Sequence, residues 1–474
     1  MKTLFLNPPS FNGFDGGAGS RYQARREIRS FWYPTWLAQP AALVPESRLV
    51  DAPARGLSLA AVLPLARDYE LLIIHTSTPS FPSDVKVAEA FKAVNPGLVI
   101  GLVGPHVAVM PGPALAASEA VDFVAGREYD YTLMEIAAGA PFSEVDGISY
   151  RRNGRPVHNR PRTLIEDLDQ LPHVADVYRR DLVIEDYFIG YLLHPYVSLY
   201  TGRGCKARCS FCLWPQTIGG HQYRTRSPAS VLEEARKIKK YFPQVKELFF
   251  DDDTFTSDPG RTEAIARLLG REGITWSCNA RANVDRRTLT IMRENGLRLL
   301  LVGFESGCQE ILNNVRKGIR VETARQFMAD CHDLGITVHG TFIVGLPGET
   351  HETIRQTIAY AREINPHTIQ VSLAAAYPGT ELYRQAAANG WLVDEGRQLV
   401  ASDGLQVSSL AYPHLAKEEI FQAVETFYKR FYFRPGKMLE MVAEMARSPR
   451  MLKRRLREGA EFMHFLGSRS AKAL

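Results

Sequence analysis

The chain has 474 residues, of which 45% are hydrophobic and 23% charged, a balance typical of a globular protein with two or three domains. Its net charge of +5 is too small to indicate nucleic-acid binding by itself, and six cysteines in a chain of this length do not make a disulfide framework. The sequence shows neither a long apolar run nor a signal-peptide pattern at its start, so we expect a cytoplasmic protein.

Residues 1–135 contain short apolar runs that alternate with helical patterns. The expected strands cover 3–7, 48–51, 71–75, 98–103 and 121–125, and the expected helices include 36–44 and 83–94. These runs predict a parallel sheet covered on both faces, a Rossmann-like (flavodoxin-like) α/β domain. Ligands of such sheets bind beyond the carboxyl ends of the strands. The loops at those ends are rich in small and polar residues, and a glycine-rich stretch at 12–20 follows the first strand.

Residues 136–190 are predicted to form a connector that contains a hairpin over 147–155, with Asn153-Gly154 as its turn. Residues 191–395 hold six strand–helix repeats, with strands at 196–201, 246–251, 275–279, 299–304, 337–344 and 368–373. Six repeats predict a partial (β/α)6 TIM barrel, whose functional groups lie at the C-terminal strand ends.

Residues 396–474 are predicted to be a mainly helical C-terminal region. The segment 438–465 is amphipathic and basic. Such a segment can make peripheral contact with an anionic membrane, and it can equally cap the barrel with a solvated face.

Three cysteines lie in the stretch TGRGCKARCSFCLW at 201–214: Cys205, Cys209 and Cys212. Thiolates are the usual ligands of iron–sulfur clusters. Three thiolates can bind three irons of a cubane cluster and leave the fourth iron open to a substrate or cosubstrate. The aromatic Phe211 fits a loop that packs against a bound ligand. Three unrelated thiols, or a zinc site without its fourth ligand, are the alternatives.

This cysteine spacing resembles the signature of the radical S-adenosylmethionine (SAM) enzymes. In that family the open iron binds SAM, and an electron from the 4Fe-4S cluster cleaves SAM to a deoxyadenosyl radical. The resemblance implies a reducing compartment and an electron donor such as flavodoxin or ferredoxin. Motifs at the later strand ends also resemble those of the family. The implied SAM contacts are Phe211, Asp251, Asp252, Asp253, Arg281, Glu305, Val344 and Gly345.

The N-terminal domain resembles the cobalamin-binding module of many radical SAM enzymes, with Gly104-Pro105-His106 at the matching strand end. The Asp-x-His-x-x-Gly motif of other cobalamin proteins is missing, so no motif assigns His106 as an axial ligand. A Rossmann-like domain without a corrinoid is the alternative. The implied cobalamin contacts are Thr76, Ser77, Gly104, His106 and Gly126.

The first 45 residues resemble hopanoid-biosynthesis radical SAM proteins of the HpnJ type. The resemblance implies a hopanoid lipid substrate and contraction of the glucosamine ring of glucosaminyl bacteriohopanetetrol to the cyclitol ether head group. Tyr191, His339, Tyr377 and Arg281 lie near predicted strand ends and could hold a polar head group.

Three other functions compete with ring contraction. The first is a cobalamin-dependent radical SAM C-methyltransferase acting on a lipid or other small molecule. The second is a non-catalytic cluster or cobalamin sensor, which would not need the SAM motifs. The third, tRNA modification, is disfavoured because a nucleic-acid-binding domain and a second cysteine set are not evident in the sequence.

Overall fold

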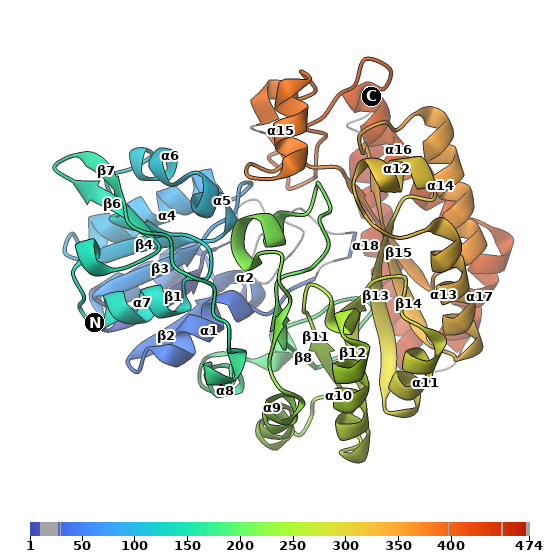
Figure 1. The fold of residues 1–474 in the computed structure, drawn as a ribbon, viewed down its shortest axis with the longest axis horizontal. Helices are drawn as coiled ribbons and strands as arrows, with labels where there is room; N and C mark the ends of the chain where they lie inside the picture. The colour runs from blue at the N-terminus through green and yellow to red at the C-terminus, as the bar shows by residue number, and fades with distance from the viewer. Residues whose placement is uncertain (10–26, 29, 397, 447–448, 471–474) are drawn as a thin grey trace.

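A computed structural model describes residues 1–9, 27–28, 30–396, 398–446 and 449–470. Two α/β units lie side by side, the first blue to teal and the second green to orange (Figure 1). The predicted fold class is confirmed, because each unit is built on its own largely parallel sheet. The glycine-rich stretch 12–20 lies outside the described residues.

The N-terminal sheet has the strand order β2-β1-β3-β4-β5-β6-β7. Its first five strands are parallel, in the order known from flavodoxin-like folds. The predicted hairpin forms β6 and β7 and pairs antiparallel with β5, so this sheet continues beyond residue 135. The strands are β1 (Thr3–Asn7), β2 (Ser47–Asp51), β3 (Leu71–His75), β4 (Val99–Val103), β5 (Phe123–Ala125), β6 (Ile148–Arg152) and β7 (Arg155–His158).

Helices cover both faces of this sheet, which is why every residue of β1 and β3 is buried. The helices of this part of the chain are α1 (Thr35–Leu43), α2 (Ala52–Arg55), α3 (Leu59–Val62), α4 (Phe81–Val94), α5 (Pro105–Val109), α6 (Pro111–Ala116), α7 (Asp130–Ala137) and α8 (Ala175–Asp181).

The second sheet is a partial barrel of six parallel strands in the order β15-β14-β13-β12-β11-β8. The strands are β8 (Tyr196–Leu199), β11 (Glu247–Phe250), β12 (Trp276–Ala280), β13 (Leu297–Glu305), β14 (Thr337–Val344) and β15 (Thr368–Leu373). The helices around them are α9 (Pro228–Tyr241), α10 (Pro259–Arg271), α11 (Arg286–Glu294), α12 (Gln309–Asn314), α13 (Val321–Asp333), α14 (His351–Ile364) and α15 (Glu381–Ala388).

The outer edge of β15 is capped by side chains. The backbone N–H groups of Ile369 and Val371 donate to the hydroxyls of Tyr432 and Tyr428 at 2.9 and 2.8 Å. Gln406 accepts the N–H of the last residue of the strand at 2.9 Å. These bonds occupy donors that would otherwise pair with another strand, so the barrel stays open at this edge.

Three C-terminal helices pack beside this edge: α16 (Lys417–Tyr432), α17 (Pro435–Ala446) and α18 (Pro449–Ser470). The basic segment predicted at 438–465 therefore spans parts of two helices. Among the described residues, no helix combines the length and the apolar character needed to cross a bilayer.

Two buried arginines join the units. They lie on the short strands β9 (Gly202–Arg203) and β10 (Arg224–Thr225), which pair with each other and bracket the cysteine stretch. Arg203 pairs with Asp130 at 2.7 Å, and Arg224 pairs with Glu128 at 2.7 Å. All four side chains are at most 7% exposed, so the cysteine stretch is anchored to the N-terminal unit at both of its ends.

Replacing Arg203 by Met should lower the free energy of unfolding by about 3–5 kcal/mol, because Asp130 then stays buried without its partner. Urea denaturation followed by circular dichroism measures the loss. Arg236→Met is the matched control, since its pair with Glu272 is exposed and should contribute less than about 1 kcal/mol. Equal losses in the two variants would contradict this assignment.

Candidate functional site

All three cysteines of the predicted cluster motif line one cavity of about 310 Å³. Cys205 and Cys209 are buried and Cys212 is half-buried. The cavity lies at the carboxyl edge of the barrel strands, where parallel barrels carry their functional groups.

Three cysteines that line one cavity match the number of protein ligands of a cubane cluster with one open iron. Among the described residues, no group of three Cys, His, Asp or Glu side chains could hold a single metal ion. A cubane cluster makes a different demand, because each thiolate binds a separate iron. Burial raises the pKa of the Cys205 thiol, and coordination to a metal deprotonates such a thiol. The three cysteines could therefore hold a 4Fe-4S cluster.

Gln216 fixes the conformation of the cysteine loop. Its side-chain NH2 donates to the carbonyl oxygens of Cys209, Ser210 and Cys212 at 3.3, 3.2 and 2.7 Å. Its Oε1 accepts the backbone N–H of Glu381 at 2.8 Å. The sequence prediction missed this residue, because no local pattern shows which side chain folds back onto a loop.

The three carboxylates predicted to meet SAM point in different directions. Asp253 lines the cavity. Asp252 is buried and accepts the backbone N–H and hydroxyl of Thr201 at 2.5 and 2.7 Å. Asp251 accepts from the Nδ2 of Asn279 at 2.8 Å. Asp251 and Asp252 therefore fix neighbouring strand ends, and Asp253 is the member of the three that faces the cavity.

Arg281 and Glu305 both line the cavity, together with Lys317, which the sequence prediction missed. Lys317 Nζ lies 2.6 Å from Glu305 Oε1, and both side chains are 8% exposed. Arg281 donates to the Lys317 carbonyl. The group combines fixed cations with a carboxylate, which suits a zwitterionic ligand such as the amino-acid end of SAM.

Glu305 also has an unusual backbone conformation. Its φ is +63°, at an irregularity in the pairing of β13 with β14. A non-glycine residue in this region costs energy and is frequent at functional sites.

Two predicted SAM contacts, Val344 and Gly345, lie at the end of β14, next to residues that line the cavity. Ile343 lines the cavity, whereas neither Val344 nor Gly345 does. Thr341 and Phe342 also line it, so the cavity-lining part of β14 ends one residue before Val344. The Gly345 carbonyl accepts from Tyr412 at 2.8 Å. Phe211 and Tyr377 line the cavity.

The residues predicted to contact cobalamin gather at the carboxyl edge of the N-terminal sheet: Thr76 and Ser77 after β3, Gly104 and His106 after β4, and Gly126 after β5. Helix α5 in this edge packs against the helical segment Pro215–Gly219, which follows the cysteine loop. The edge therefore faces the cluster motif.

The segments at this edge pack closely on one another and carry two histidines. A Cβ on Gly104 would lie 2.2 Å from the Thr76 carbonyl oxygen, so only glycine fits there. Burial lowers the pKa of His106 to about 4, and its Nδ1 lies 3.2 Å from the Thr78 hydroxyl. The Nε2 of His75 is buried and has no hydrogen-bond partner among the described residues. A neutral imidazole and an unsatisfied nitrogen thus lie where a cofactor could bind.

Comparisons with known proteins agree with this geometry. Residues 199–361 match the model of the radical SAM superfamily. An uncharacterized methyltransferase of Pyrococcus horikoshii is 27% identical over 463 residues, which are 94% of this chain and 95% of the relative. The hopanoid C-3 methylase of Methylococcus capsulatus is 28% identical over 253 residues, which are 51% of this chain and 44% of the relative.

A solved structure has the same fold. The radical SAM methyltransferase TsrM of Kitasatospora setae, determined with cobalamin and a 4Fe-4S cluster bound, superposes with a TM-score of 0.68. The match covers 99% of this chain and 100% of TsrM at 13% identity. TsrM contains a 4Fe-4S cluster and cobalamin, which are two of the three cofactors predicted from this sequence.

Replacing Gln216 by Ala should weaken the cluster without unfolding the chain. The loss of its bonds to the loop carbonyls corresponds to about 1–3 kcal/mol, so bleaching of the reconstituted cluster by an iron chelator should be at least about fivefold faster. Absorbance and iron content measure the effect. Gln244→Ala, which removes an exposed bond to Glu185, serves as control. Equal bleaching rates would show that Gln216 does not position the loop.

Proposed function

We propose that the chain is a cobalamin-dependent radical SAM methyltransferase that acts on a lipid or another apolar small molecule. The observation that carries the proposal is the single cavity that Cys205, Cys209 and Cys212 share with Arg281 and Glu305. The similarity to a methyltransferase over nearly the whole chain and the fold shared with TsrM support it.

In this proposal the cysteines hold the 4Fe-4S cluster, and the group of Asp253, Arg281, Glu305 and Lys317 binds the charged end of SAM. When bound, the cluster and SAM supply a hydrogen-abstracting radical, and cobalamin supplies a methyl group. The protein positions these groups and excludes water. The buried Lys317–Glu305 pair holds both side chains in a fixed orientation before any ligand arrives.

The cobalamin would bind at the carboxyl edge of the N-terminal sheet. The packing of α5 on Pro215–Gly219 brings this edge next to the segment that follows Cys212. A methyl donor on this edge and a radical source in the barrel would thus be held by neighbouring elements. We also propose a small redox protein, flavodoxin or ferredoxin, as the electron donor, and no nucleic-acid partner.

Ring contraction of a hopanoid head group is the second candidate. The resemblance of the first 45 residues to hopanoid-biosynthesis proteins favours it. The similarity to a hopanoid C-3 methylase supports a hopanoid substrate, but it supports methylation rather than ring contraction.

The test incubates the reconstituted protein without oxygen with SAM, methylcobalamin, a reductant and glucosaminyl bacteriohopanetetrol, and follows products by mass spectrometry. A methyltransferase yields deoxyadenosine, S-adenosylhomocysteine and a lipid heavier by one methylene. An isomeric lipid would assign ring contraction instead. An unchanged lipid with deoxyadenosine would exclude this substrate, and no deoxyadenosine at all would contradict the radical SAM assignment.

The Cys209→Ala variant should make no detectable deoxyadenosine, because one iron loses its ligand. Cys331→Ala is the control, since Cys331 is a free, buried thiol on α13 outside the cavity. It should keep activity close to that of the unchanged protein. Circular dichroism checks that both variants fold. Similar deoxyadenosine yields from the two variants would contradict the proposed cluster site.

A further inference from the structure

Exposed apolar side chains concentrate at the C-terminal helices. Of the nine large hydrophobic residues that are exposed in the described chain, seven lie between Phe433 and Met463. We call these seven the C-terminal patch: Phe433, Met438, Leu439, Val442, Leu452, Leu456 and Met463. Leu439 is 70% exposed and Val442 60%. Concentrated exposure of this kind marks an interaction surface.

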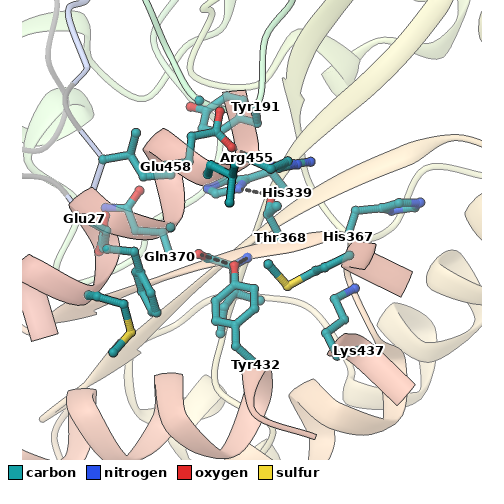
Figure 2. Close-up of a pocket in the computed structure, with 18 of the residues that line it drawn as sticks. Glu27, Tyr191, His339, His367, Thr368, Gln370, Tyr432, Lys437, Arg455 and Glu458 are labelled. Atoms are coloured by element: carbon teal, nitrogen blue, oxygen red, sulfur yellow. Dashed lines mark hydrogen bonds and ion pairs between the residues drawn. The ribbon is translucent and has the colours of Figure 1, made fainter. Parts of the chain in front are cut away.

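A second cavity, of about 540 Å³, lies behind the patch. Its walls come from the β15 edge, α17, α18 and residues near Tyr191. Figure 2 shows Tyr191, His339 and Arg455 close together at one side of this cavity and Tyr432 and Lys437 at the other. Five residues of the patch also line the cavity: Phe433, Met438, Val442, Leu456 and Met463. The patch is therefore the mouth of the cavity.

This cavity adjoins the one that holds the cysteines. Trp32, Tyr191 and Gln370 line both. Tyr191 stacks on His339 with ring centroids 4.1 Å apart. The two cavities thus share a wall, and the outer cavity is mostly apolar.

Basic residues lie on the helices beside the mouth. Residues 435–470 contain eight Lys or Arg and four Glu. Lys453 is exposed on α18, and Arg457 is 55% exposed on the next turn. Basic side chains beside an apolar helical face favour the surface of an anionic bilayer.

We propose that the C-terminal patch docks on an anionic lipid bilayer, with the mouth of the cavity facing the membrane. The apolar side chains enter the acyl boundary, and the flanking cations lie at the lipid phosphates. A bilayer is favoured over a protein partner because exposed apolar and basic side chains alternate along one helix, α18. The proposal concerns binding alone and does not depend on the reaction assigned above.

The test is co-sedimentation of the full chain with vesicles of phosphatidylcholine alone and of phosphatidylcholine mixed with phosphatidylglycerol. Neither SAM nor reductant is present, so a failed methyltransferase assignment does not affect the result. We expect binding that is stronger to the anionic vesicles and weakened by salt. Lys453→Gln should weaken binding to the anionic vesicles alone.

The double variant Leu439→Asp, Leu452→Asp removes two patch residues that do not line the cavity. It should bind both kinds of vesicle at least about tenfold more weakly, because binding then buries two fewer apolar side chains. Val183→Asp is the control, since Val183 is an exposed apolar residue outside the patch and should leave binding unchanged.

Circular dichroism and thermal unfolding show that each variant folds. Equal vesicle binding by the double variant and the unchanged protein would overturn the proposal, and so would no binding to either vesicle. Light scattering tests whether a second copy of the chain binds the patch instead. If the protein does not bind vesicles but forms a dimer, and the double variant is a monomer, the patch is a contact between two copies of the chain.

Discussion

The buried ion pairs between the two units are the constraint on which the site depends. Arg203 and Arg224 flank the cysteine loop on paired short strands, and their partners Asp130 and Glu128 belong to the N-terminal unit. Buried charges are costly unless each meets its partner, so such pairs tolerate one docking geometry. Beside them Trp36 stacks on Trp214 with ring centroids 5.4 Å apart and planes at 3°. The cysteine loop thus takes its position from both units.

Most of the fold could be predicted from the sequence, since strand patterns and helix caps are local. The strands at 3–7, 71–75, 337–344 and 368–373 were predicted to the residue, and Ser227 caps α9 through a local hydrogen bond to the backbone of Ser230. The predicted connector hairpin instead extends the first sheet, because its pairing with β5 is a long-range contact that turn chemistry does not reveal.

The candidate site was harder to predict, because its geometry depends on contacts between distant segments. The cysteines could be found from spacing. Gln216 and Lys317 could not. Gln216 acts by bonding to the carbonyls of the folded cysteine loop, and Lys317 acts by pairing with Glu305. The cavity-lining residues of β14 end at Ile343, one residue before the predicted contact Val344. Strand-end motifs identify the end of the strand but not which of the adjacent residues lines the cavity.

The open edge of the barrel connects the fold to the chemistry. Tyr428 and Tyr432 satisfy the N–H groups of β15 that a further strand would have taken, and a helix thereby stands where a barrel would close. Because a helix takes the place of a further strand, there is room for the cavity between β15 and α18. Charged side chains line both cavities, but the outer one carries four methionines, Met438, Met441, Met445 and Met463, and its wall is the more apolar of the two. Under the proposed function, this wall favours the apolar part of an amphiphile, because burying apolar surface removes it from water.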